Sequence, residues 1–235
     1  EHVEGIALYC DSVAQCSFVE SIVQPAQLRR LTVIANIRGL VQLVRQCRQL
    51  ERLEVGRVPA REAVGVLDAI GSLSKLRRLW IIVEWESLHR FQMCLERLQA
   101  LRSLDMTIRG ESIVKHLGHF SLAGLQEVTL AGLPFSAVAP MLAGCTCLRK
   151  LIVDEFEVED STGTRIVEDV VGVLADLPML CFLKLRGDSG VGSTVREVMT
   201  VALGRVAKWG FCESPFAHCS WTRLTKRFAE SADFF

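Results

Sequence analysis

The sequence predicts an α/β solenoid, a stack of short units that each contain one strand followed by one helix. Two observations support this prediction. An apolar-x-x-apolar-x-apolar pattern recurs eight times between residues 3 and 185, and segments with apolar residues at helical spacing lie between its occurrences. A single strand and helix cannot bury their apolar sides alone, so neighbouring units must stack. We therefore expect about eight repeats over residues 1–194.

Each occurrence of the pattern is expected to form a strand, because side chains of an extended chain point alternately to opposite faces. Successive occurrences start 22 to 26 residues apart, except for a last step of 32 residues. Periods of about 20–29 residues are typical of one class of solenoid. The apolar positions of the expected strands are Val3/Ile6/Leu8, Leu28/Leu31/Val33, Leu50/Leu53/Val55, Leu76/Leu79/Ile81, Leu101/Leu104/Met106, Leu125/Val128/Leu130, Leu148/Leu151/Val153 and Leu180/Leu183/Leu185.

Helices are expected between the strands, where apolar residues recur three and four positions apart. Examples are Leu40/Leu43/Val44/Cys47, Val64/Leu67/Ile70/Leu73 and Ile166/Val170/Val173/Leu174. Adjacent strands lie about 4.8 Å apart, whereas helices with side chains are about 10 Å across. The stack should therefore curve into a horseshoe, with parallel strands on the concave face and helices on the convex face.

Two segments depart from this repeat. Residues 154–160 form an acidic insertion, which we expect to be a solvated loop, with contact to a basic partner as the alternative. Residues 195–235 are expected to form a C-terminal capping helix over 195–206 and an aromatic tail beyond it. Solenoid ends need such a cap, and docking of the tail on a partner is the alternative.

Residues 3–187 resemble the leucine-rich-repeat family. Cys47-Arg-Gln-Leu50 and Cys145-Thr-Cys-Leu148 place a cysteine at a helix end just before a strand, as in the ribonuclease-inhibitor-like and cysteine-containing types that are typical of intracellular members. The resemblance implies a horseshoe that binds macromolecules on its strand face. Asn36 fills the position where the family places Asn or Cys, but the other repeats lack it, so a continuous asparagine ladder is not expected.

Composition narrows the class of protein further. The 27 basic and 27 acidic residues cancel, yet residues 28–109 carry 15 basic and 8 acidic side chains. No apolar run reaches the roughly 18 residues that a membrane span requires, so no membrane partner is expected. Nine scattered cysteines and the lack of a glycosylation sequon favour an intracellular protein. The cytoplasm is the expected compartment, and an organelle or the nucleus stays open.

Several motifs resemble catalytic or metal sites but lack an essential part. The stretch 187–194 has the glycine spacing of a phosphate-binding loop, but Ser193 replaces the lysine that would meet the phosphates. His116 and His119, or Cys212, His218 and Cys219, lack the paired spacing of a metal site. We therefore expect no enzyme, no cofactor, no metal and no small-molecule substrate.

The predicted strands display a row of arginines on the concave face. Arg30, Arg52 and Arg78 occupy the third position of three successive patterns, and Trp80 lies beside the last of them. Like charges on neighbouring strands repel, which favours a binding role with guanidinium groups and one aromatic anchor. The alternative is that Arg30 and Arg52 pair with Glu51 and Glu54 and keep the sheet soluble. The predicted partner-binding residues are Arg30, Arg52, Arg78, Trp80, Arg102 and Lys150.

The functional hypothesis is a non-catalytic protein-protein interaction module, acting as a scaffold or assembly subunit that holds its partner on the concave strand face. A protein partner is expected. The alternative is an RNA- or ribonucleoprotein-associated subunit that uses the basic repeats over 28–109, and binding to phosphates would then weaken steeply with salt.

Overall fold

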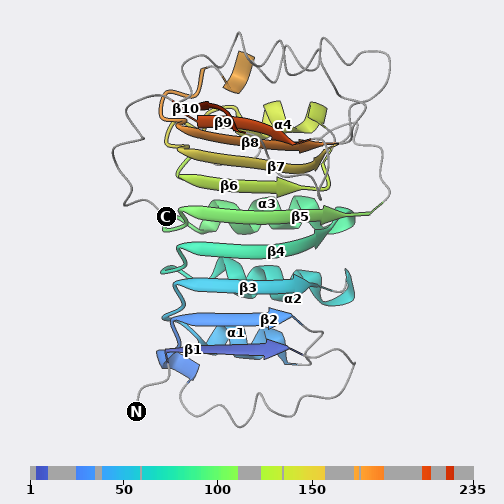
Figure 1. Cartoon of the computed structure of the whole chain (residues 1–235). Coiled ribbons are helices and arrows are strands. Elements are labelled where there is room, and N and C mark those ends of the chain that lie inside the picture. Colours follow the sequence, from blue (N-terminus) through green and yellow to red (C-terminus); the bar gives the residue numbers. More distant parts are fainter. Residues whose placement is uncertain are drawn as a thin grey trace. The chain divides into compact units, whose positions relative to one another are not determined.

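The computed structural model describes residues 4–9, 25–34, 39–58, 60–110, 123–133, 135–156, 172–174, 176–187, 208–212 and 221–224. The chain divides into two compact units, Glu1–Ile113 and Val114–Phe235. Each unit contains strands that pair in chain order with the next strand along the sequence (Figure 1).

The described residues of unit 1 form five parallel strands with short helices between them. Its elements are β1 (Gly5–Tyr9), η2 (Pro25–Gln27), β2 (Arg30–Ile34), α1 (Leu40–Gln46), β3 (Arg52–Arg57), α2 (Ala60–Gly71), β4 (Arg78–Glu84), η3 (Trp85–Ser87), α3 (Leu88–Arg97) and β5 (Ser103–Arg109). Parallel pairing joins β1 to β2, β2 to β3, β3 to β4 and β4 to β5. This order is the one that the repeat predicts.

The strands of unit 1 alternate between buried apolar and outward-facing side chains. In β4, Leu79, Ile81 and Val83 are buried, whereas Arg78 and Trp80 face outward. The same alternation holds in β2 and β5. Because a shift of one residue would turn the leucines to solvent, the apolar pattern sets the pairing register.

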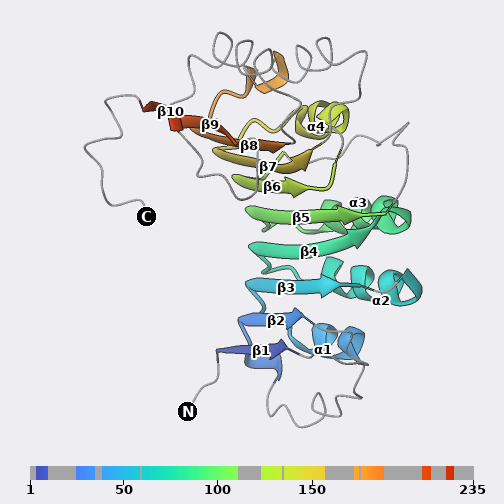
Figure 2. The same ribbon diagram turned by 45° about the vertical axis from the view of Figure 1, so that its right-hand side comes forward.

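Helices α1, α2 and α3 cover one face of the strands of unit 1 (Figures 1 and 2). Each helix turns its apolar side inward: Leu43 and Val44 of α1 and Phe91 of α3 are fully buried. Neighbouring helices contact one another in chain order, α1 with α2 and α2 with α3. The opposite side of the strands carries no helix among the described residues. We call the strand side chains of this side the open face of unit 1.

Glycine permits close packing where α2 meets α3. A Cβ atom built on Gly71, the last residue of α2, would lie 3.3 Å from Cδ of Arg97 and 3.6 Å from Cα of Cys94. These atoms belong to α3. A Cβ atom at position 71 would therefore contact the α3 backbone and require a small shift of the Arg97 side chain.

Unit 2 continues the alternation of strands and helices. Its described elements are β6 (Glu127–Ala131), α4 (Phe135–Leu142), β7 (Lys150–Phe156), β8 (Phe182–Gly187), β9 (Lys208–Cys212) and β10 (Trp221–Leu224). Strands β6 to β9 pair in parallel, and β10 pairs with β9 in the antiparallel direction. Val128, Leu130, Leu151, Val153, Leu183 and Leu185 form its buried strand core.

Strands β9 and β10 were not expected from the sequence, which suggested only a helix and an aromatic tail after residue 194. The register pairs Leu183 with Trp209 and Leu185 with Phe211, so β9 repeats the strand pattern of β8. The expected helix over 195–206 and the residues after 224 lie outside the described part of the chain. The domain boundary at residue 194 and the cap stay predictions.

The predicted fold class is confirmed: parallel strands follow one another in chain order with helices between them. All eight predicted strand segments are strands, and β7 extends to Phe156, into the acidic segment that was expected to be a loop. The rest of that segment, 157–160, lies outside the described residues. None of the helices described is both long and apolar enough to cross a bilayer.

Candidate functional site

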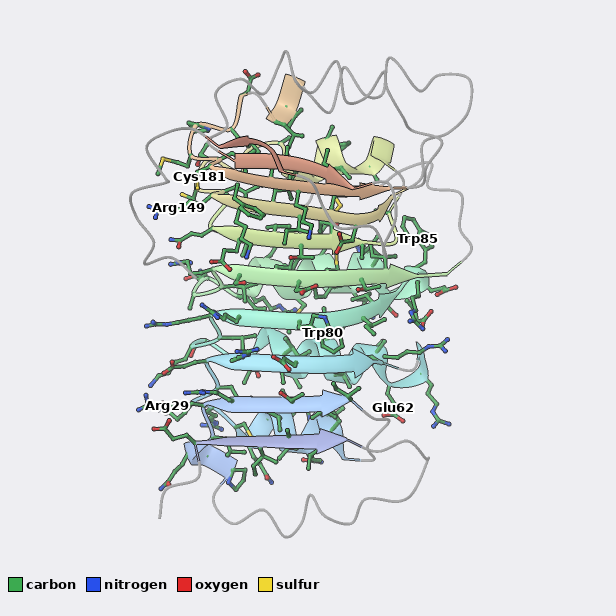
Figure 3. The ribbon with its side chains drawn as sticks, in the orientation of Figure 1. Arg29, Glu62, Trp80, Trp85, Arg149 and Cys181 are labelled. Atoms are coloured by element: carbon green, nitrogen blue, oxygen red, sulfur yellow. The ribbon has the colours of Figure 1, made fainter. Side chains whose placement is uncertain are left out.

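The predicted row of arginines exists on the open face of unit 1. The strand register places Arg30 beside Arg52, Arg52 beside Arg78, and Arg78 beside Ser103. Two residues further along the strands, Thr32, Glu54, Trp80 and Asp105 form a second row. Trp80 lies half-buried near the middle of the open face (Figure 3).

Two of the three arginines in the row form ion pairs. The guanidinium of Arg52 donates to Glu54, with Nε 2.9 Å from Oε1, and Thr32 donates to the other oxygen of the same carboxylate at 2.9 Å. Arg30 pairs with Glu4 at 4.0 Å. The alternative of paired arginines is thus observed for Arg52 and Glu54. Arg30 pairs with Glu4 and not with Glu51. Glu51 pairs instead with Arg29, at 3.6 Å.

Main-chain hydrogen bonds align the residues that immediately precede the strands. The carbonyl of Arg29 accepts the N–H groups of Glu51 and Arg52 at 2.8 and 3.0 Å. The same double contact recurs from Glu51 to the β4 start and from Arg77 to the β5 start. These bonds hold the pre-strand residues in one row, which reads Glu4, Arg29, Glu51, Arg77 and Arg102. Charge alternates along the row until two arginines follow one another.

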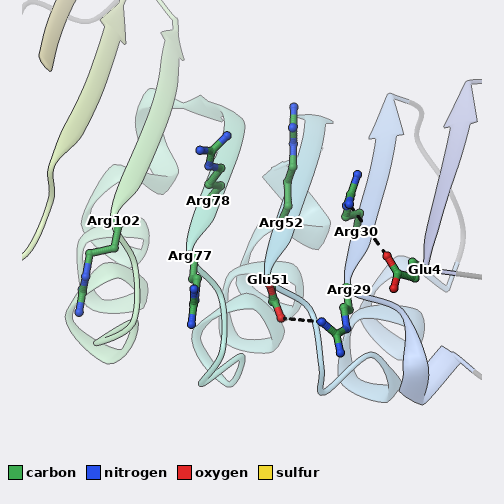
Figure 4. A pocket seen from close by; sticks show the side chains of 8 residues that line it. All are labelled: Glu4, Arg29, Arg30, Glu51, Arg52, Arg77, Arg78 and Arg102. Carbon is green, nitrogen blue, oxygen red and sulfur yellow. Dashed lines mark ion pairs between the residues drawn. The ribbon is translucent and has the colours of Figure 1, made fainter. Parts of the chain in front are cut away.

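The row of Arg30, Arg52 and Arg78 and the row of pre-strand residues together line an open groove of about 570 Å³ at the end of unit 1 where the strands begin. Its lining consists of six arginines and two glutamates: Arg29, Arg30, Arg52, Arg77, Arg78, Arg102, Glu4 and Glu51. Figure 4 shows that Arg30, Arg52 and Arg78 point one way and Arg29, Arg77 and Arg102 the other. The groove therefore carries a net positive charge, which is divided between two sets of arginines that point in opposite directions.

The positive charge is least compensated at the start of β4. Arg102 uses Nη1 to donate to the carbonyls of Gln99 and Leu101, at 3.0 and 2.8 Å. By contrast, Arg77 and Arg78 make no ion pair or side-chain hydrogen bond with any residue that the structure describes. Free guanidinium donors are suited to bidentate contacts with a carboxylate or phosphate.

Lys150, the sixth predicted site residue, belongs to unit 2. It lies between Glu127 and Phe182 in the strand register, and its ammonium sits 5.5 Å from the centre of the Phe182 ring. A cation over a ring face is attracted by the ring's quadrupole. Of the six predicted residues, Arg30, Arg52, Arg78, Trp80 and Arg102 thus lie together in unit 1, and Lys150 has its own surroundings.

Sequence reasoning missed the contribution of Glu4. It precedes β1 as Arg29 precedes β2. Glu4 and Arg29 both occupy the second position of the repeated pattern. Comparing that position across repeats would have placed Glu4 next to Arg29 and Arg30.

Three cysteines in the described part lie in the core. Burial raises the thiol pKa from 9.0 to about 11 for Cys47 and Cys145, and to about 12 for Cys94. Cys147, by contrast, is exposed. Among the described residues no group of three potential ligands could hold a metal ion. The candidate ligands His116, His119, His218 and Cys219 lie outside these residues.

We expect the buried thiols to resist alkylation in the native protein at pH 8. A pKa rise of two units lowers the thiolate fraction about 100-fold, and burial also blocks the reagent. Iodoacetamide should therefore modify Cys147 first and Cys47, Cys94 and Cys145 only after denaturation, as peptide mass mapping would measure. Equal rates for Cys47 and Cys147 in native buffer would contradict the burial.

The same shifts make folding stability depend on pH. Because the folded-state pKa lies above the unfolded value of 9.0, the contribution of each buried thiol is complete below pH 9. It is lost as the pH rises toward 11 for Cys47 and toward 12 for Cys94.

The chain belongs to the leucine-rich-repeat family, whose model, described as a leucine-rich repeat region, matches residues 10–226. Repeat proteins of this kind use extended surfaces for binding, which supports a protein-binding module as the general class. No curated protein matches the chain.

The solved structures that are similar to the chain include a tropomodulin domain and a leiomodin site. The tropomodulin C-terminal domain of Caenorhabditis elegans has 12% identity and a TM-score of 0.41, and the match covers 71% of this chain and 90% of that domain. Leiomodin-1 actin-binding site 2 has 8% identity and a TM-score of 0.36, with 71% of this chain and 89% of that one covered.

Proposed function

We propose that the chain is a non-catalytic protein-interaction module, a scaffold or assembly subunit that binds a protein partner on the open face of unit 1. The proposed contacts are Arg30, Arg52, Arg78, Trp80 and Arg102, and Lys150 is a proposed contact on unit 2. The buried, reduced thiols of Cys47, Cys94 and Cys145 support an intracellular role.

One observation carries the proposal: the groove holds six arginines against two glutamates, on strands whose register aligns them. Like charges on adjacent strands lower stability, so stability alone does not account for this arrangement. Trp80 provides a half-buried aromatic surface next to Arg78, and interface hot spots are enriched in Trp and Arg.

Acidic residues within and beside the arginine rows favour a protein over RNA. Glu51 lies between Arg29 and Arg77, and Glu54 lies between Thr32 and Trp80. A nucleic acid presents a continuous series of phosphates, some of which would face these carboxylates. A protein surface can instead place acidic groups only where arginines are free.

Charge reversal of the row tests the proposal. We expect the double variant Arg52→Glu/Arg78→Glu to lose at least about tenfold in affinity for the protein captured by the full chain, or about 1.4 kcal/mol. The measurement is quantitative affinity capture with mass spectrometry, at two salt concentrations. A matched control is Arg45→Glu/Arg90→Glu, which reverses two exposed arginines on α1 and α3.

Folding of both double variants is compared by circular dichroism and thermal melting. The proposal fails if the Arg52→Glu/Arg78→Glu protein is folded and captures its partner as well as the wild type. It also fails if the RNA in the captured material, and not a protein, depends on these arginines and is released by moderate salt.

A further inference from the structure

The spacing and pairing of the arginines define the shape of the ligand that would fit the groove. Arg30, Arg52 and Arg78 begin three adjacent strands. Strands lie about 4.8 Å apart, so the three positions span about 10 Å across the sheet. A ligand whose acidic groups meet all three arginines must present them with this repeat.

A helix matches this repeat and an extended chain does not. Residues i, i+4 and i+7 of an α-helix lie on one side and span about 10.5 Å along its axis. Residues i, i+2 and i+4 of a strand span about 13 Å. The extended ligand would be displaced by about 3 Å at the third arginine, roughly the length of a hydrogen bond.

The existing ion pairs show which arginines already have an acidic partner and which have guanidinium donors left for a ligand. Arg29, Arg30 and Arg52 are already paired with Glu51, Glu4 and Glu54. Arg77 and Arg78, on either side of the β4 start, have no such partner among the described residues. A carboxylate placed over the arginine row at β4 therefore gains the Arg78 guanidinium without displacing an internal acid, whereas Arg77 points to the opposite side.

Trp80 adds an apolar contact on the same strand. It follows Arg78 by two residues, on the same face of β4, and lies half-buried between Glu54 and Asp105. A helix lying across the strands could cover the ring with an apolar residue next to its acidic row.

We infer that the ligand of the open face is an acidic amphipathic helix of another protein, lying across the strands with carboxylates one turn apart on the arginine row and anchored mainly by Arg78. This inference rests on the proposed function, since it names the kind of partner that the same face would bind.

The test uses three fluorescent peptides of identical composition and the full chain. The first carries glutamates at i, i+4 and i+7 of an alanine- and glutamine-rich helix. The second carries them at i, i+5 and i+10, about 140° apart around the helix. The third carries them at i, i+2 and i+4, with its two prolines moved from the ends to the centre to prevent a helix. Fluorescence anisotropy measures each affinity, and polyuridylic acid serves as the nucleic-acid probe.

We expect the first peptide to bind about tenfold more tightly than the other two, which is the scale of one charge-assisted hydrogen bond. Arg78→Gln should weaken its binding about tenfold, whereas Arg52→Gln should change it less than about threefold. Arg78 and Arg52 occupy the same position on the neighbouring strands β4 and β3 and differ in that Arg52 is already paired with Glu54.

Other outcomes overturn the inference in distinguishable ways. Equal binding of the three peptides, or tighter binding of the third, rejects the helix but leaves the proposed function standing if the Arg52→Glu/Arg78→Glu variant still loses its captured partner. Tight, salt-sensitive binding of polyuridylic acid without peptide binding rejects both the helix and the protein partner.

Discussion

Replacing Met106 by aspartate is expected to destabilise unit 1 by about 5 kcal/mol or more, because an ionised carboxylate would be buried without a partner. Met106 lies in the centre of β5, is fully buried, and pairs with Ile81 of β4. The total stability of a folded domain is about 5–15 kcal/mol. Met106→Asp should therefore unfold much of unit 1 at room temperature, as circular dichroism and urea titration would measure.

The matched control is Thr107→Asp, which introduces the same group at the next residue of the same strand. Thr107 is on the open face and only half-buried. Its side chain can keep contact with water, so we expect a change of about 1 kcal/mol or less. If both variants melted alike, the alternation of inward and outward side chains in β5 would be wrong.

Phe91→Ala is expected to lower the free energy of unfolding by about 3–5 kcal/mol. Among the residues that the structure describes, Phe91 is the largest of the fully buried side chains, and it lies on the inner side of α3. The cost has two parts, the lost transfer of the ring from water and the cavity that remains. Because repeats are stabilised mainly by their neighbours, the loss should also weaken the contact between α2 and α3.

Met93→Ala provides the comparison, since Met93 lies on the same helix but is 42% exposed. Alanine favours helix and little apolar area is removed, so its effect should stay within about 0.5 kcal/mol. Guanidinium titrations of the two variants measure the difference. A smaller loss for Phe91→Ala than for Met93→Ala would contradict the orientation of α3.

The sheet could be predicted in detail because the two-residue alternation of side chains in a strand can be read from residues that are close together in the sequence. Leucine or valine at the fourth and sixth pattern positions must point to the same face, which sets both strand identity and register. This is why Arg30, Arg52 and Arg78 were placed side by side correctly.

β9 was missed although the pattern is present. Val206, Trp209 and Phe211 have the spacing apolar-x-x-apolar-x-apolar, and Val206 follows Leu180 by 26 residues. Val206 also fits the helical spacing of the preceding segment, and aromatic residues stand where earlier strands have leucine. The local sequence was therefore compatible with two periods, and pairing with β8 decides for the strand.

The amino-acid sequence by itself determined the repeat, the inward-facing core and the rows of charge, since these follow from periods of two and of about 24 residues along one chain. Only the tertiary structure decided which charges neutralise one another: Glu4 reaches Arg30, Arg102 turns to main-chain carbonyls, and Arg77 and Arg78 are left unpaired among the described residues. Long side chains reach groups on neighbouring repeats, so their pairing depends on distances across the stack and not on spacing along the sequence.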